Sequence, residues 1–186
     1  MNFTKTYTQQ MDKNFMTRNT KTNQSNREDL ILFNKVFLWG MLILPWFTLF
    51  FLKKEGIKRY MPVAIFASLL MTVYNVFAYN QKHWEIKVTI IPLLKPLFVS
   101  GLFGGFLIVT IWIFYYTYGY FWKYLITNIV ADFMFAIFPI HYLFQEKLGI
   151  YQLHNITPLG RFTLFVIFAL LIYLYQMWQE EVLISK

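Results

Sequence analysis

The chain has 186 residues, of which 58% are hydrophobic, 22% are aromatic and only 14% are charged. A soluble domain usually has about a quarter of its residues charged, so this composition indicates an integral membrane protein. Cysteine is absent, which excludes a disulfide framework, a thiolate metal site and a cysteine nucleophile. The net charge is +8, but the basic residues lie in the N-terminal segment and between apolar runs, which favours membrane anchoring over nucleic-acid binding.

Residues 1–29 form a polar, basic segment that is rich in Thr, Asn, Gln and Lys and contains no apolar run. The segment lacks the hydrophobic region and the small-residue cleavage site of a signal peptide. Its low hydrophobicity predicts a disordered tail, which either has no role of its own or adsorbs to anionic lipid headgroups. A second, short tail is predicted at the C-terminal end, over residues 181–186.

Apolar runs follow the tail, with lengths that suit a hydrocarbon core needing about 20 helical residues. They cover residues 30–52, 61–79, 97–116, 124–144 and 162–178. Apolar strands would need a closed barrel with alternating polarity, so these runs are predicted to be helices. The sequence therefore predicts an all-α integral membrane bundle over residues 30–180 with about five transmembrane helices, four or six being the alternatives. Pro62 falls in the first turn of the second run, where a missing N–H costs little.

Several segments between the runs are predicted to lie at the membrane surface. Residues 115–124 are rich in Tyr, Phe and Trp, whose amphipathic rings favour the headgroup layer. Residues 84–96 mix charged side chains with Ile, Leu and Pro, which favours an interfacial segment over a re-entrant loop. The basic side chains of the first connection are candidates for binding anionic lipids: Lys53, Lys54, Lys58 and Arg59. Basic residues are nearly balanced between the two sides, so the positive-inside rule leaves the orientation open.

One acidic residue, Asp132, lies well inside an apolar run, about 12 Å along the fourth predicted helix. A carboxylate at that depth costs roughly 2.5–3.5 kcal/mol on insertion scales. Asn128 lies one helical turn earlier on the same face, and the second predicted helix has a polar stripe formed by Ser68, Thr72 and Asn75. We predict that these five residues form a buried polar cluster. The cluster is either a proton, cation or headgroup site, or a set of hydrogen bonds that holds the helices together.

Small residues in the third predicted helix form two overlapping pairs at a spacing of four. Gly101 and Gly105 make a GxxxG pair, and Ser100 and Gly104 make a second pair of small residues. Small residues at this spacing let helix backbones approach closely. The pattern predicts packing within the bundle, with dimerisation as the alternative.

Catalytic and metal-binding motifs are absent from the sequence. It contains no P-loop, no GxSxG and no GxGD paired with a second intramembrane Asp. His141, Glu146 and His154 are conceivable metal ligands by type, but their spacing matches no zinc motif. No metal and no cofactor is therefore expected.

Four segments together resemble an uncharacterised family of small multi-pass membrane proteins from spore-forming Gram-positive bacteria. These segments read KRYMPVAIF, NVFAYNQKHW, TIWIFYYTYGYFWKY and FQEKLGIY, and the resemblance covers residues 55–180. It implies a helical bundle in the cell membrane and brings no catalytic residues.

The expected function is that of a non-catalytic membrane component that binds lipid or a partner, where the partner is a second copy or another membrane protein. The alternative is a transporter or channel subunit that uses the polar cluster around Asp132. A membrane-embedded enzyme is the third hypothesis. An enzyme using two carboxylates would have to pair Asp132 with a Glu at the surface.

Overall fold

A computed structural model describes residues 24, 28–95, 97–154 and 157–184, so nearly all of the predicted N-terminal tail lies outside the described residues. The first helix is Glu28–Phe51, whose last turn, η1 (Thr48–Phe51), is a 3-10 helix. The remaining elements, in chain order, are α2 (Lys54–Asn80), β1 (Trp84–Ile86), η2 (Pro92–Leu94), η3 (Ser100–Phe106), α3 (Leu107–Thr117), α4 (Phe121–Phe135), η4 (Ala136–Lys147), β2 (Tyr151–Leu153) and α5 (Pro158–Ile184). Both η3 and η4 are π-helical. Element η3 continues directly into α3, and η4 continues directly from α4.

Helix α2 begins earlier than the sequence predicts. The helix starts at Lys54, and Lys53 before it is in an extended conformation. Glu55 lies in the first turn, where the positive end of the helix dipole stabilises a negative charge. Pro62 therefore lies inside the helix rather than in its first turn. The prediction was wrong here because it placed the start of the helix at the start of the apolar run. The backbone is already helical over the basic residues that precede the run.

Among the described residues, four helices are long and apolar enough to cross a membrane: Glu28–Phe51, Lys54–Asn80, Ser100–Thr117 and Phe162–Val182. The remaining predicted span, 124–144, is helical along its whole length as the end-to-end elements α4 and η4. The protein is thus an all-α membrane bundle, as its sequence predicts.

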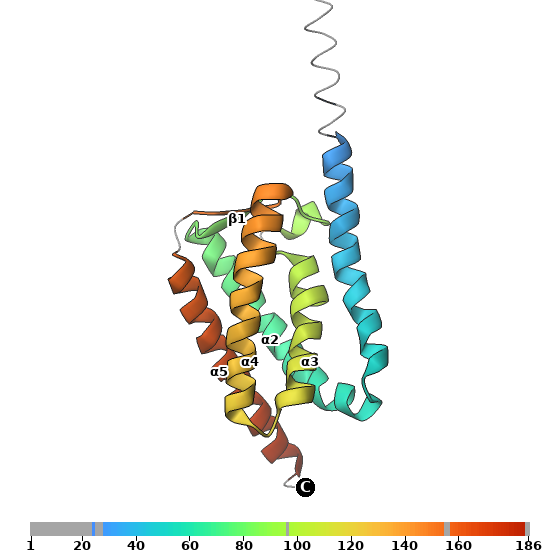
Figure 1. Ribbon diagram of the computed structural model, residues 1–186, viewed down its shortest axis with the longest axis vertical. Helices are drawn as coiled ribbons and strands as arrows, with labels where there is room; N and C mark the ends of the chain where they lie inside the picture. Colours follow the sequence, from blue (N-terminus) through green and yellow to red (C-terminus); the bar gives the residue numbers. More distant parts are fainter. Residues whose placement is uncertain (1–23, 25–27, 96, 155–156, 185–186) are drawn as a thin grey trace, which may run out of the picture.

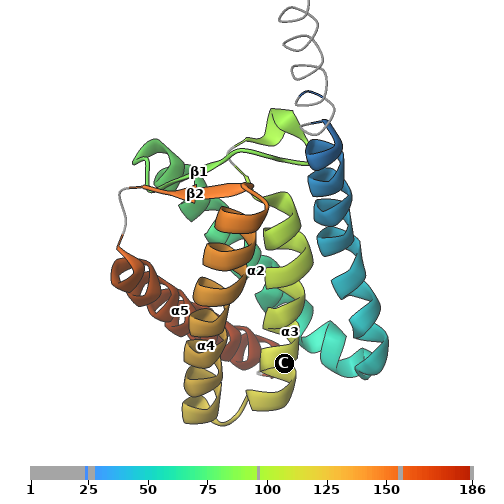
Figure 2. The same cartoon turned by 45° about the horizontal axis from the view of Figure 1, so that its top comes forward.

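The short sheet fixes how the chain runs through the bundle. Strands β1 and β2 pair antiparallel, with Trp84 opposite Leu153 and Ile86 opposite Tyr151. Since β1 follows α2 and β2 follows η4, both connections lie at the same end of the bundle (Figures 1 and 2). The chain between them must run to the far end along η3 and α3 and return along α4 and η4.

Helices α2 to α5 surround a common interior. Helix α3 packs against α2 and α4, and α5 packs against the same two helices, so α2 and α4 face each other across the middle. The first helix lies outside this group beside α3 (Figure 1). Trp46 Nε1 donates to the Phe103 carbonyl at 3.1 Å, and Trp112 Nε1 donates to Thr48 Oγ1 at 3.0 Å. Only 11% of the most apolar stretch of the first helix is buried, against 56% for Ser100–Thr117, so the first helix is the peripheral one.

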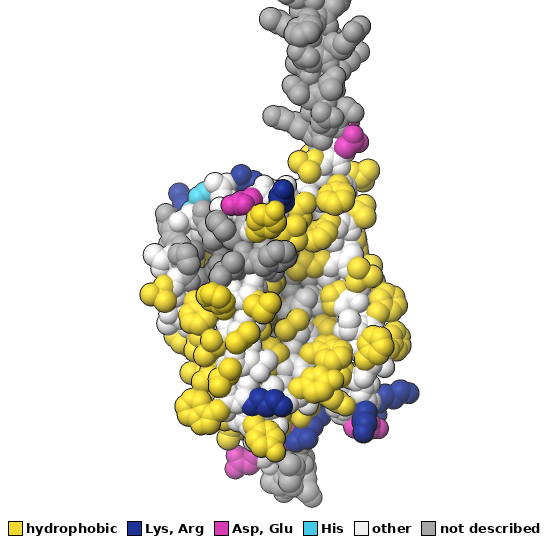
Figure 3. Space-filling view, viewed as in Figure 1, with side chains coloured by type: hydrophobic (Ala, Val, Ile, Leu, Met, Phe, Trp, Pro, Cys, Tyr) yellow, Lys and Arg dark blue, Asp and Glu magenta, His cyan; other side chains and the backbone are white. Residues whose placement is uncertain are grey.

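The outer surface has the layered polarity of a membrane protein. Apolar side chains cover the flanks, while charged side chains gather at the two ends (Figure 3). Large exposed apolar residues occur on every long helix, for example Leu44, Val73, Val109, Val130 and Leu174. Soluble monomers rarely expose so extensive an apolar surface, whereas lipid tails solvate it without cost.

Candidate ligand cavity

A cavity lies between α2, α3, α4 and α5. It offers about 110 Å³ of space to the centres of water molecules. One water needs roughly 10–15 Å³ on the same measure, so the cavity has room for a small molecule or for part of a larger one. Its described lining consists of Met71, Asn75, Trp84, Phe98, Gly101, Leu102, Phe106, Thr110, Tyr124, Asn128, Asp132, Phe135, Phe144, Phe165, Phe168, Ala169 and Ile172.

One wall of the cavity is a polar row on α4. Tyr124, Asn128 and Asp132 follow one another at a spacing of four, which places them one above another on one helix face. The Tyr124 hydroxyl is buried and donates to the Ala169 carbonyl of α5 at 2.9 Å. Asn128 Nδ2 donates to the Tyr124 carbonyl at 2.9 Å. The row therefore contacts α5 through Tyr124, and its next two members, Asn128 and Asp132, line the cavity.

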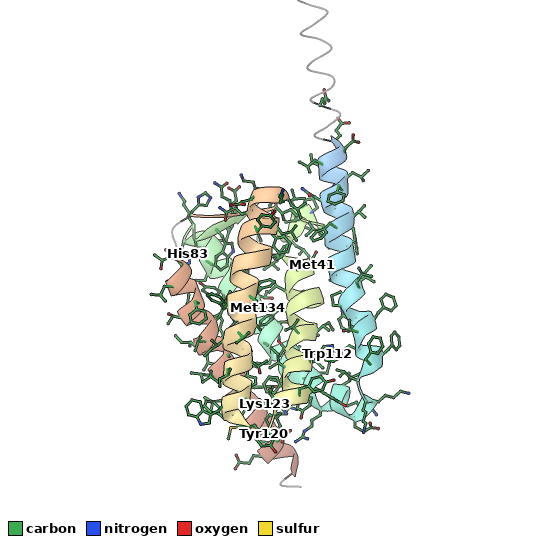
Figure 4. All side chains as sticks on the ribbon, in the orientation of Figure 1. Met41, His83, Trp112, Tyr120, Lys123 and Met134 are labelled. Carbon is green, nitrogen blue, oxygen red and sulfur yellow. The ribbon has the colours of Figure 1, made fainter. Side chains whose placement is uncertain are left out.

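Asp132 is the acidic member of this row. Its side chain is half-buried, and no described side chain forms a hydrogen bond or an ion pair with it. Met134, two residues further along α4, lies near the middle of the bundle between its two charged ends (Figure 4). Asp132 therefore sits at mid-depth, as its place in the apolar run predicts.

Two polar residues line the cavity from the other helices. Asn75 of α2 is buried and its Nδ2 donates to the Met71 carbonyl at 2.7 Å. Thr110 of α3 is also buried, and its hydroxyl donates to the Phe106 carbonyl at 2.8 Å. The Thr110 hydroxyl proton is thus used within its own helix, so this residue can offer a ligand its oxygen as an acceptor. Asn75 can offer its amide oxygen and the second N–H of Nδ2.

The structure divides the predicted polar cluster. Asn75, Asn128 and Asp132 line the cavity, whereas Ser68 and Thr72 do not. The Ser68 hydroxyl donates to the Leu102 carbonyl at 3.3 Å and so joins α2 to η3. Thr72 donates to the Ser68 carbonyl of its own helix at 2.7 Å. Ser68 and Thr72 therefore serve helix packing in this geometry, and the three cavity residues remain candidates for ligand contact.

Sequence reasoning missed Tyr124 and Thr110 as cavity residues. Tyr124 belongs to the aromatic segment predicted at the membrane surface, yet its side chain is 1% exposed. Its spacing of four from Asn128 was a signal that could have placed it in the same row. Thr110 offers no such signal, because it is a single hydroxyl in an apolar run.

Aromatic rings form most of the rest of the lining. Trp84 of β1 closes the cavity at the sheet end, and its ring meets the Tyr74 ring edge to face at 5.4 Å between centroids. Phe98 and Phe144 meet edge to face at 5.6 Å near the same end. Residues 84–95 of the segment predicted to be interfacial (84–96) thus cross this end of the bundle and cover the cavity there, while Pro96 lies outside the described residues (Figure 2).

The small residues of η3 pack against the first helix. A Cβ atom at Gly104 would clash with the Met41 carbonyl oxygen and lie 2.7 Å from Leu42 Cα, so the two backbones are in contact there. Ser100 is buried, and Gly105 lies opposite the flexible end of Met41. Gly101 lines the cavity instead, and a Cβ there would meet the Phe98 ring.

No group of three His, Cys, Asp or Glu side chains suited to a metal ion occurs among the described residues. The His141 side chain lies outside the described part of the structure. His154 approaches Glu85 across the sheet, with 4.0 Å between Nε2 and Oε2. This single contact involves exposed side chains.

Comparisons with known proteins add no family to this picture. No protein-family model, no curated protein and no solved structure matches the chain.

Proposed function

We propose that this protein is a non-catalytic, multi-pass component of the cell membrane that binds an amphipathic, lipid-like molecule between α2, α3, α4 and α5. The observation that carries the proposal is the cavity itself. Aromatic and aliphatic side chains form most of its walls, and a polar row of Tyr124, Asn128 and Asp132 runs along one of them. Ligand sites in proteins are typically apolar hollows with a few convergent polar groups that set the orientation of the ligand.

The surroundings of the cavity favour a ligand that arrives through the lipid. The helices around it expose large apolar side chains to the bilayer, among them Val73 on α2, Phe133 on α4 and Leu171 on α5. A molecule that is already dissolved in the bilayer can approach these helices without leaving an apolar medium. The size of the cavity suits a polar headgroup with a short length of chain, with the rest of a longer chain remaining in the bilayer.

The hydrogen bonds of the lining favour binding over catalysis. The Tyr124 hydroxyl, the Thr110 hydroxyl and both asparagine amides already donate to backbone carbonyls. Nucleophilic catalysis needs a nucleophile within hydrogen-bond reach of a base, and among the described lining residues no hydroxyl is bonded to Asp132. These lining residues are therefore suited to orienting a bound ligand.

A second surface supports contact with anionic lipids at one end of the bundle. Lys53, Lys54 and Lys58 are exposed around the start of α2, at the membrane surface. Each basic side chain near an anionic surface contributes about 1 kcal/mol of attraction. Arg59, which the sequence groups with them, is held by Glu180 and contributes less to this surface.

Native mass spectrometry of the full chain released from its membrane in mild non-ionic detergent tests the cavity proposal. We expect a lipid-like adduct on the wild type and its loss from Ala169→Phe, because the larger side chain fills the space beside Tyr124. Leu171→Phe is the matched control, since it adds bulk to the exposed face of the same helix. Equal adducts on wild type and Ala169→Phe, or none on any form, would refute the proposal.

A further inference from the structure

We infer that the ligand of this cavity carries a protonated amine that pairs with Asp132. This inference rests on the proposed function and names the chemical class of its ligand. It comes from a mismatch of charge in the lining. Asp132 places an acid in the cavity, while no Lys, Arg or His stands among the described lining residues to balance it.

An ionised carboxylate away from water needs a counter-charge or several hydrogen bonds to be stable. No described side chain bonds to Asp132, and in the same row the Tyr124 hydroxyl and one N–H of Asn128 donate to backbone carbonyls instead. A ligand amine would supply both a positive charge and N–H donors. A phosphate or carboxylate headgroup would instead bring a second negative charge to the same wall, which disfavours anionic lipids at this site.

The other walls also suit a cation with N–H groups. The amide groups of Asn75 and Asn128 each use one N–H of Nδ2 on a backbone carbonyl, which leaves each of them an acceptor oxygen and a second N–H for a ligand. Oxygen acceptors favour an amine with N–H donors over a quaternary ammonium. The rings of Phe106, Phe135 and Phe168 lie around the same space, and aromatic faces attract cations within about 6 Å.

The cavity therefore assigns an orientation to the ligand. Its amine lies at mid-depth beside Asp132, and its apolar chain lies against the phenylalanine rings of α4 and α5. The same geometry separates this ligand from the anionic headgroups expected at Lys53, Lys54 and Lys58, which lie at the end of the bundle.

Competition between three probes of equal chain length tests the inference: octylamine, octanol and octanoate, added to the purified full chain in non-ionic detergent and followed by displacement of the native adduct. We expect octylamine to bind the wild type at least tenfold more tightly than octanol, and octanoate to bind most weakly. Asp132→Asn should reduce octylamine binding at least tenfold and reduce octanol binding much less, because only the amine loses a charge pair. Glu181→Gln, which removes an exposed carboxylate outside the cavity, should change neither.

The outcomes separate this inference from the proposed function. If octylamine and octanol bind alike to the wild type and both are lost in Ala169→Phe, the cavity binds amphiphiles but the amine assignment is wrong. Octylamine binding that survives Asp132→Asn also overturns the assignment. Probe binding that is the same in wild type and Ala169→Phe would overturn the cavity proposal as well. The wild-type ranking of the three probes decides the assignment even if Asp132→Asn fails to fold.

Discussion

The Arg59 guanidinium and the Glu180 carboxylate join α2 to α5 through two parallel hydrogen bonds, with 2.8 Å between Nη2 and Oε2. The guanidinium also lies over the rings of Tyr60 and Tyr118, 5.4 and 5.3 Å from their centroids. Gln176 Nε2 donates to the same carboxylate at 2.9 Å. One end of the bundle is thus closed by a charge pair between two residues that are 121 positions apart in the chain.

A double-mutant cycle measures what this pair contributes. We expect Arg59→Ala and Glu180→Ala to couple by about 0.5–1 kcal/mol in the free energy of unfolding, because the pair is bidentate but Arg59 is 51% exposed. Unfolding by sodium dodecyl sulfate in mixed micelles gives each free energy. Purely additive effects of the two substitutions would show that solvent screening cancels the pair.

Tyr118 should titrate above the ordinary range of tyrosine. Burial, and to a smaller extent the neighbouring Glu180 carboxylate, raises the pKa of Tyr118 to about 12 from the usual 10.0. Since the folded state favours the neutral phenol, the stabilisation from Tyr118 is complete below pH 10 and is lost as the pH rises through 12. Ultraviolet absorbance of tyrosinate, wild type minus Tyr118→Phe, gives the midpoint. A difference curve centred near pH 10 in the folded protein would contradict the half-buried position of this ring beside Glu180.

Site-specific labelling tests whether α4 and η4 together cross the membrane. The chain has no cysteine, so single substitutions report without background. We expect Lys82→Cys and Lys147→Cys to react with a membrane-impermeant maleimide from one side, and Lys53→Cys and Tyr120→Cys from the other. The reason is the β1–β2 pairing, which places the connections after α2 and after η4 at the same end of the bundle. Labelling of Tyr120 and Lys147 positions from the same side would exclude a crossing by this helix.

Two glycines of η3 give a matched test of helix packing. Gly104→Ala should destabilise the fold by about 1–3 kcal/mol, because the new methyl group would overlap the backbone of Met41 and Leu42, which cannot move without displacing the first helix. Gly105→Ala should have a small effect, because its Cβ would lie 3.6 Å from the flexible Met41 side chain. The same micellar unfolding assay compares the two. Equal losses in the two variants would contradict the close backbone approach at Gly104, because helix propensity alone favours Ala over Gly at both positions.

The polar cluster shows how far helical periodicity reaches. Spacing alone predicted correctly that Asn128 and Asp132 share one face of their helix. It also grouped Ser68, Thr72 and Asn75, but only Asn75 reaches the cavity, while Ser68 meets η3 and Thr72 bonds within α2. A stripe at helical spacing drifts around the helix, so its members face different neighbours once the helix is packed.

The class of this protein follows from its amino-acid sequence, because the length and apolarity of a run decide whether it suits a bilayer, and both are local properties. The sequence also predicts the depth of Asp132, since rise per residue converts position into distance along a helix. Three contacts could be seen only in the folded chain: Tyr124 and Thr110 line a cavity with Asp132, Gly104 contacts the first helix, and Arg59 pairs with Glu180. These contacts depend on the rotation of each helix against its neighbours and on the order of helices around the bundle. The rotation and the order of the helices are set by how all the side chains pack together, and a local sequence pattern carries no information about that packing.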